Sequence, residues 1–116
     1  MGLAAKYFDV CMEKGWDATG GGFVYSLDLG LGFANDDKYK WVQAEGIAAA
    51  AMLASAIPEK AKHYWGAYDR IWRYSWATLV DHTHGSWYRL VSREGRRYDE
   101  LKCPAGKVDY HITGMC

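Results

Sequence analysis

The chain has 116 residues, of which 50% are apolar and 16% aromatic, a composition that excludes a disordered protein and supplies the core of one small domain. Its 14 basic and 14 acidic residues cancel and are interspersed, so no basic stripe is available to bind nucleic acid, and no apolar run is long enough to cross a bilayer. We therefore predict a soluble, cytoplasmic protein with neither a membrane nor a nucleic-acid partner.

The first third of the chain predicts a helix followed by an extended segment. Apolar residues recur at helical spacing over residues 3–14, and Gly15 ends this helix. After a run of glycines, residues 23–28 have the pattern of a strand. A polar loop follows, in which Asp36 or Asp37 is placed to cap the next helix. The apolar stripe of the first helix consists of Leu3, Tyr7, Val10 and Cys11.

Two long helices occupy the middle of the chain. Residues 38–57 predict an inner helix, because Gln43 and Glu45 are the only strongly polar residues in its central part. Pro58 ends this helix, and residues 59–80 form another with an apolar stripe at 3,4 spacing and a broad polar face. The second helix is therefore expected to pack outside the first.

The last third predicts a strand over residues 86–92, a hairpin turn at 93–96, and a new helix that begins at His111. Helical pairs with β inserts at one end are the repeat of an α/α toroid, in which each repeat buries a face against the next. Only one and a half repeats fit before Cys116. We therefore expect a fragment that is incomplete at both ends, with residues 1–116 forming part of one domain.

Trp41 and Glu45 are four residues apart and lie on the same face of the inner helix. A ring and a carboxylate side by side suit a sugar site. The alternative is structural: Glu45 pairs with Lys40 or Arg89, and Trp41 belongs to the core. Spacing alone does not separate these two interpretations.

His111 is the second candidate for chemistry. Histidine changes charge near neutral pH, and at the first turn of a helix the dipole disfavours its charged form, which suits a base. The alternative is a structural histidine that hydrogen-bonds Asp109 or Tyr110. His63, His82 and His84 are interpreted as surface residues. The three cysteines lack metal-site spacing, so reduced thiols and no metal are expected.

Short sequence elements at these two clusters and elsewhere resemble the N-acylglucosamine 2-epimerase superfamily, which includes cellobiose 2-epimerases and the mannose and sulfoquinovose isomerases. The resemblance implies part of an (α/α)6 barrel, close to its C-terminal end, in an all-α fold with short β-hairpin inserts. The elements, in chain order, are Gly21-Gly22-Phe23-Val24-Tyr25-Ser26-Leu27-Asp28, Lys40-Trp41-Val42-Gln43-Ala44-Glu45, Asp81 with Gly85-Ser86-Trp87-Tyr88, Ser92-Arg93-Glu94-Gly95, and Gly106-Lys107 with Tyr110-His111.

The same resemblance implies roles for individual residues. His111 corresponds to the histidine that moves the proton of the reacting sugar carbon, and Glu45 to its carboxylate partner. A second catalytic histidine is expected upstream of Met1, so the isolated chain is expected to be inactive. The residues expected to contact the substrate are Trp41, Arg89, Trp87 and Tyr110.

Two departures from the family pattern favour aldose–ketose isomerisation of a mannose-type sugar over 2-epimerisation. Lys40 precedes Trp41 where many epimerases have a second tryptophan, and Gly114 stands where epimerases tend to have an arginine. No cofactor is implied. The expected partners are a monosaccharide and the missing part of the barrel, and a homo-oligomer stays open.

The alternative of another class is a non-catalytic carbohydrate-binding module, in which Trp41, Trp87 and Tyr88 stack on sugars. A glycoside hydrolase on the same toroid needs two carboxylates that flank the scissile bond, and no convincing second carboxylate to match Glu45 occurs near the hairpin or His111.

Overall fold

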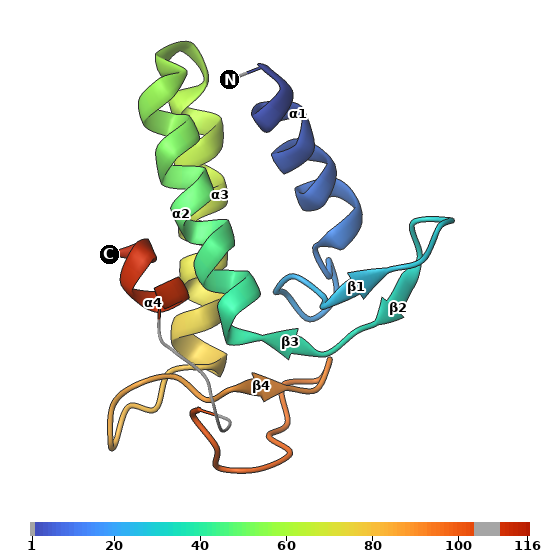
Figure 1. Cartoon of the computed structure of the whole chain (residues 1–116), viewed down its shortest axis with the longest axis vertical. Coiled ribbons are helices and arrows are strands. Elements are labelled where there is room, and N and C mark those ends of the chain that lie inside the picture. The colour runs from blue at the N-terminus through green and yellow to red at the C-terminus, as the bar shows by residue number, and fades with distance from the viewer. Residues whose placement is uncertain (1, 104–109) are drawn as a thin grey trace.

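A pair of antiparallel helices, α2 (Lys40–Ala56) and α3 (Ala61–Thr78), forms the centre of the computed structural model, which describes residues 2–103 and 110–116. Figure 1 shows α2 and α3 side by side, with α1 (Gly2–Val10) leaning toward them and α4 (Tyr110–Met115) against the opposite flank of α2. A π-helical turn (Cys11–Gly15) extends α1, and a 3-10 turn (Pro58–Lys60) separates α2 from α3. The predicted mostly helical architecture is confirmed.

The core lies where α2 meets α3 and the segment after α1. The alanine-rich side of α2 carries little bulk, so larger side chains from other elements can lie close to its backbone. At Gly46, a Cβ atom would come within 2.6 Å of the Phe23 ring, so only glycine lets this ring pack there. The buried apolar residues include Phe8, Phe23, Ile47, Leu53, Tyr64, Ile71, Leu79, Trp87 and Val91.

Four short strands occupy one end of the described structure. Strand β1 (Ser26–Leu27) pairs antiparallel with β2 (Phe33–Asn35), and their hairpin projects from the body in Figure 1. Strand β3 (Lys38–Tyr39) pairs antiparallel with β4 (Leu90–Val91), which joins the start of α2 to the chain after α3.

The strand predictions at 23–28 and 86–92 were too long. Residues 21 and 22 have positive φ, and at Gly22 a Cβ would come within 2.4 Å of the Tyr74 ring, so the chain turns sharply before β1. The turn at 93–96 is confirmed, because Ser92 N donates to Arg96 O and Val91 bridges Arg97.

The predicted cap of the inner helix was wrong. Helix α2 begins at Lys40 and has no side-chain cap. Its first amide instead donates to Arg89 O across the β3–β4 pair at 3.0 Å, which satisfies a group that a cap would otherwise bind. Asp37 accepts a hydrogen bond from the Tyr98 hydroxyl at 2.6 Å.

The apolar stripe predicted for the first helix is not the face that the helix buries. Leu3 and Tyr7 are 63% and 62% exposed, whereas Ala5 and Phe8 are buried. The reason is tertiary: the Phe8 ring packs edge-on against Tyr64 of α3, with 5.7 Å between ring centroids. Helical spacing identifies the period of such a stripe but not the partner that covers it.

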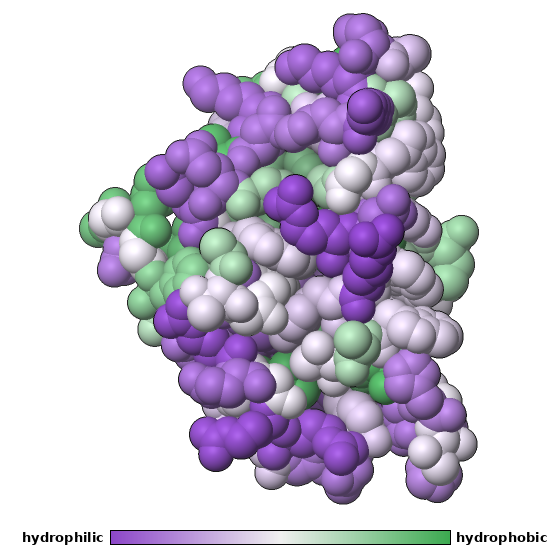
Figure 2. Space-filling view, turned by 180° about the vertical axis from the view of Figure 1, so that it is seen from behind, coloured by the Kyte–Doolittle hydropathy of each residue, from purple (hydrophilic) through white to green (hydrophobic). Residues whose placement is uncertain are grey.

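The surface mixes charged and apolar side chains. Figure 2 shows them interspersed on the face opposite to that of Figure 1. None of the helices in the described ranges combines the length and the apolar character that a membrane span requires.

A buried ionic cluster holds three segments of the strand-bearing end together. The Asp17 carboxylate accepts hydrogen bonds from Lys38 Nζ at 3.0 Å and Arg93 Nε at 3.1 Å, and Asp17 and Lys38 are 1% and 0% exposed. Burial alone would raise the pKa of Asp17, but hydrogen bonds from Arg93, Lys38, Gly20 and Thr19 outweigh it and hold the pKa well below its ordinary range.

Gln43 performs a similar task with a neutral side chain. It is fully buried, and its Oε1 accepts from Phe23 N while its Nε2 donates to Phe23 O, both at 2.8 Å. The Gln43 side-chain amide therefore binds both backbone groups of Phe23, as a neighbouring strand would. These two hydrogen bonds hold the segment before β1 on the surface of α2.

The first prediction concerns Asp17→Asn. This change leaves the Lys38 ammonium buried without an opposite charge, so we expect the free energy of unfolding to fall by about 3–5 kcal/mol. Urea denaturation followed by circular dichroism measures the loss. The exposed Asp69→Asn on α3 is the control and should stay within about 0.5 kcal/mol of the parent. A loss below about 1 kcal/mol for D17N, the size of a surface pair, would contradict the role of the cluster.

The same carboxylate predicts a pH dependence. The pKa of Asp17 is lower in the folded chain than its unfolded value of about 3.9, so its stabilising contribution is complete above that value and is lost as the pH falls through the folded-state pKa. The parent chain should lose stability more steeply below about pH 4 than Asp17→Asn does. Equal slopes for the two proteins in acid urea titrations would count against this assignment.

Gln43→Leu tests the amide bridge. Leucine leaves the N–H and C=O of Phe23 buried without their partner, and each such group costs about 1–3 kcal/mol. We expect at least that loss in the urea midpoint, with the exposed Ser55→Ala of the same helix as the control. Unchanged stability in Gln43→Leu would show that the bridge contributes nothing.

Candidate functional site

His111 and Glu45 meet at the contact between α4 and α2. The Nδ1 atom of His111 lies 2.5 Å from Oε1 of Glu45, although the residues are 66 positions apart. The His111 side chain is 18% exposed and that of Glu45 is 52% exposed. Glu45 is therefore partnered by the histidine, and the alternative pairs with Lys40 and Arg89 are not the contacts that the structure gives it.

This geometry fixes which ring nitrogen is available. An ionised carboxylate only accepts hydrogen bonds, so Nδ1 of His111 must carry the proton that points to Glu45. In the neutral ring Nε2 is then left as the acceptor. The pair has the arrangement of a base whose tautomer and orientation are set by a carboxylate behind it.

Aromatic rings surround this pair. The ring centroids of Trp41 and His111 are 5.1 Å apart, and those of Tyr110 and His111 are 3.8 Å apart. Trp41 is 36% exposed and Tyr110 is 63% exposed, so both rings have surface left for a ligand. The structure thus brings four of the predicted site residues into one group, namely His111, Glu45, Trp41 and Tyr110.

Sequence reasoning missed Tyr25 and Tyr39. The Tyr25 ring lies 4.4 Å from Tyr39 and 6.3 Å from Trp41, measured between ring centroids, and is 45% exposed. Tyr25 follows the segment that Gln43 fixes on α2, which extends the aromatic group beyond Trp41. The sequence feature that could have indicated Tyr25 is the Gly21-Gly22 turn that precedes it.

Trp87 does not belong to this group, and its prediction as a substrate contact needs correction. It is only 7% exposed, and its ring packs in the core against Trp72, with 5.9 Å between centroids. A ring covered in this way has no face left for a sugar. Alternation along residues 86–92 could not indicate this, because the two residues of β4 in that stretch, Leu90 and Val91, are both buried and do not alternate.

Arg89 is engaged with the chain itself. Its Nη2 donates to Asp99 Oδ2 at 3.3 Å, and its side chain is 29% exposed. Tyr88, the third stacking platform of the non-catalytic alternative, is covered by cations: the Arg97 guanidinium carbon lies 4.3 Å and Lys102 Nζ lies 5.1 Å from its ring centroid. Two of the three rings of that alternative are thus occupied within the protein.

The other predicted features of the region have plain outcomes. His63, His82 and His84 lie at the surface, as predicted. Asp109 and the Gly106–Lys107 element lie outside the described residues. Among the residues that the structure describes, no three His, Cys, Asp or Glu side chains are placed to hold a metal ion.

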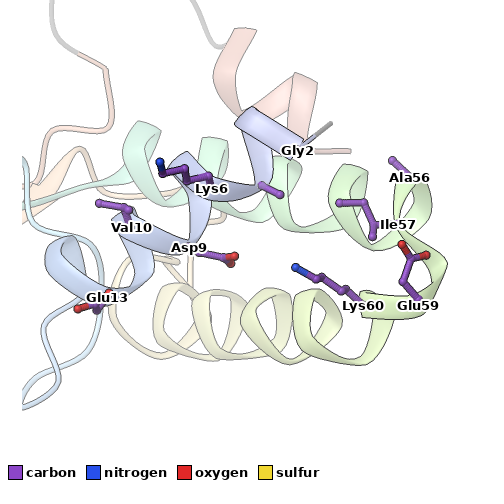
Figure 3. A pocket seen from close by; sticks show the side chains of 10 residues that line it. Gly2, Lys6, Asp9, Val10, Glu13, Ala56, Ile57, Glu59 and Lys60 are labelled. Carbon is purple, nitrogen blue, oxygen red and sulfur yellow. The ribbon is translucent and has the colours of Figure 1, made fainter.

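A hollow of about 650 Å³ lies elsewhere, between α1 and the turn that joins α2 to α3 (Figure 3). Its lining carries charges of both signs, and Asp9 and Lys60 extend into it from opposite sides. None of the predicted site residues lines it. The Asp9 carboxylate already binds His63 Nε2 at 3.0 Å, so we assign the candidate site by its chemistry rather than by the size of a hollow.

Relatives named D-mannose isomerase match most of the chain. A D-mannose isomerase of Marinomonas mediterranea is 42% identical over 113 residues, which is 97% of this chain and 28% of that protein. A D-mannose isomerase of Thermobifida fusca is 33% identical over 73% of this chain and 21% of its own length. The chain therefore spans about a quarter of the length of the relatives it matches.

Solved structures agree with the sequence matches. A crystal structure of D-mannose isomerase superposes with a TM-score of 0.89 at 42% identity, and covers 97% of this chain while 28% of that chain is matched. The cellobiose 2-epimerase of Bacillus thermoamylovorans superposes with a TM-score of 0.74 at 22% identity over 94% of this chain and 28% of its own, which supports the fold alone.

These superpositions confirm the fold prediction, since the described chain corresponds to part of an (α/α)6 barrel. The sequence profile of N-acylglucosamine 2-epimerase (GlcNAc 2-epimerase) matches residues 1–115. The chain therefore belongs to the N-acylglucosamine 2-epimerase family.

Proposed function

We propose that the protein carrying this sequence is a sugar isomerase that moves a proton from the carbon next to the sugar carbonyl to the carbonyl carbon, as an aldose–ketose isomerase of mannose-type sugars. The 2.5 Å contact between His111 Nδ1 and Glu45 Oε1 carries this proposal. The two relatives named D-mannose isomerase, at 42% and 33% identity, support the substrate class.

In the proposed reaction, Nε2 of His111 takes the proton from C2 of the open-chain aldose. The electrons of that C–H bond form the C1–C2 double bond of an enediol, while the aldehyde oxygen gains a proton from a second group. The proton on Nε2 then returns to C1 as the C2 hydroxyl becomes a carbonyl and gives its proton back to the second group, which yields the ketose. Atoms and electrons balance, so no electron acceptor is required.

Glu45 has an electrostatic role in this scheme. When Nε2 gains the substrate proton, the ring becomes an imidazolium, and the carboxylate at Nδ1 stabilises the new charge. Because the carboxylate is in place before the reaction, no reorganisation is needed as the charge forms. Removing Glu45 would therefore affect both ring orientation and basicity.

Ring faces supply the remaining contacts. Trp41 and Tyr110 flank the His111 ring and are exposed enough to pack against the C–H face of a sugar. We retain Arg89 as a proposed sugar contact through the guanidinium donors that Asp99 does not take. We place the protein in the cytoplasm, in keeping with the reduced thiols that the cysteine spacing predicts.

The test uses a chimera, because the chain spans only 28% of the Marinomonas enzyme. The matched segment of that D-mannose isomerase is replaced by this chain, and D-mannose is supplied as the substrate. We expect conversion to D-fructose. Conversion to D-glucose instead would identify a 2-epimerase, and a folded chimera that binds mannose without converting it would favour the non-catalytic alternative.

His111→Asn in the same chimera is the decisive variant. It removes the base but preserves the size of a polar side chain, so we expect turnover to fall by about 10²-fold or more, with mannose binding still detectable. The exposed His63→Asn on α3 is the matched control and should leave turnover unchanged. Retained turnover in His111→Asn would refute the proposed base.

A further inference from the structure

The Trp41 ring contacts the proposed base, but its own helix does little to hold it. Trp41 is the second residue of α2, and long helical side chains lean toward the N-terminus of their helix. The ring therefore has no earlier turn of α2 to pack on, and the residue is 36% exposed. Its orientation must come from side chains of other segments.

Within the described part of the chain, two rings from other segments contact Trp41. The Tyr25 ring meets it edge-to-face, with 6.3 Å between centroids and 83° between planes. The His111 ring lies at 5.1 Å with a tilt of 35°. The Tyr25 contact is the one that comes from outside the proposed catalytic pair.

Tyr25 is itself supported by a second tyrosine. Its ring lies 4.4 Å from the Tyr39 ring between centroids, with 39° between planes. Tyr39 is the last residue of β3 and directly precedes α2, so it stands on the rigid entry to the helix that carries Trp41. The three rings thus form a continuous row that ends at His111.

The backbone beneath both tyrosines is anchored by the buried amide of Gln43. Its Nε2 donates to the Phe23 carbonyl at 2.8 Å and to the Tyr39 carbonyl at 3.3 Å, which joins the two segments through one side chain. The next residue, Val24, is 5% exposed and its amide donates to the Gly15 carbonyl at 2.9 Å. Tyr25 therefore leaves the chain directly after a fixed stretch of backbone.

We propose that Tyr25 is a positioning residue: its ring, supported by Tyr39, sets the orientation of the Trp41 ring against His111. The catalytic meaning of this role rests on the proposed function, whereas the ring geometry can be measured without any sugar. Tyr25 acts through Trp41 and does not contact the reacting atoms. An aromatic pair of this kind shifts an equilibrium by about 2–10-fold, so its loss should redistribute the Trp41 ring without unfolding the chain.

The experiment compares Tyr25→Ala with the parent chain by NMR. The χ1 couplings of Trp41 should show the parent rotamer reduced by about 2–10-fold relative to the others, and the nuclear Overhauser contacts between the Trp41 and His111 rings should weaken. Tyr7→Ala makes the same change at a 62% exposed tyrosine of α1 and is the matched control. It should leave both measurements as they are in the parent.

Tyr25→Phe separates the ring from its hydroxyl. Phenylalanine keeps the edge-to-face contact, so we expect the couplings and ring contacts of the parent. A Tyr25→Phe chain that behaves like Tyr25→Ala would overturn the proposal, because the hydroxyl and not the ring would then be responsible. A folded Tyr25→Ala chain with the Trp41 rotamer and ring contacts of the parent would overturn it as well.

If Tyr25→Ala does not fold, Tyr25→Leu decides instead, because leucine keeps apolar bulk at this 45% exposed position but has no flat ring. We expect the same redistribution of the Trp41 ring in this variant. Parent-like ring geometry in Tyr25→Leu would count against the role of the aromatic contact.

The chimera gives an independent kinetic measurement. Tyr25→Ala should lower kcat/KM for D-mannose by about 2–10-fold, and Tyr25→Phe should restore it. An inactive parent chimera would refute the proposed function and leave the NMR comparison to judge Tyr25. An active parent with an unchanged kcat/KM in a folded Tyr25→Ala variant would refute the positioning role alone.

Discussion

The contact between His111 and Glu45 is the interaction on which the functional account depends. It joins residues 66 positions apart, one on the alanine-rich helix α2 and one on a helix of six residues. A hydrogen bond of this kind orients an imidazole only if both backbones are held in place. Much of the described structure outside the apolar core can be understood as the means of holding them.

Buried polar side chains hold them, and they gather at the start of α2. Lys38, Lys40 and Gln43 are each at most 2% exposed. Lys38 and Gln43 bond to the loop of residues 17–23 before β1, and Lys40 bonds to the Lys102 carbonyl. Such groups are costly to bury but specific in their partners. The end of the helix that carries Trp41 and Glu45 is thereby fixed from several sides, while the other end of α2 packs mainly through alanine and leucine.

The helices could be predicted because their signals are local. An alanine-rich run followed by Pro58 places α2 to within two residues, and the shared face of Trp41 and Glu45 follows from four-residue spacing. The features that failed depend on partners distant in the sequence. The first amide of α2 donates to the Arg89 carbonyl across a strand pair. The buried face of α1 is the one that packs against Tyr64, and Trp87 is buried against Trp72. Likewise, spacing left the partner of Glu45 open among Lys40 and Arg89, and only family resemblance pointed to His111.

The tautomer of His111 shows whether the Glu45 carboxylate orients the proposed base. At about pH 8, where an ordinary histidine is neutral, ¹⁵N NMR of the ring distinguishes a proton on Nδ1 from a proton on Nε2. We expect the Nδ1–H form, with Nε2 unprotonated and free to act as the base, and we expect Glu45→Gln to shift the ring toward a mixture of the two. A parent chain whose His111 carries its proton on Nε2 would contradict the account, because the nitrogen assigned to the substrate would then be a donor.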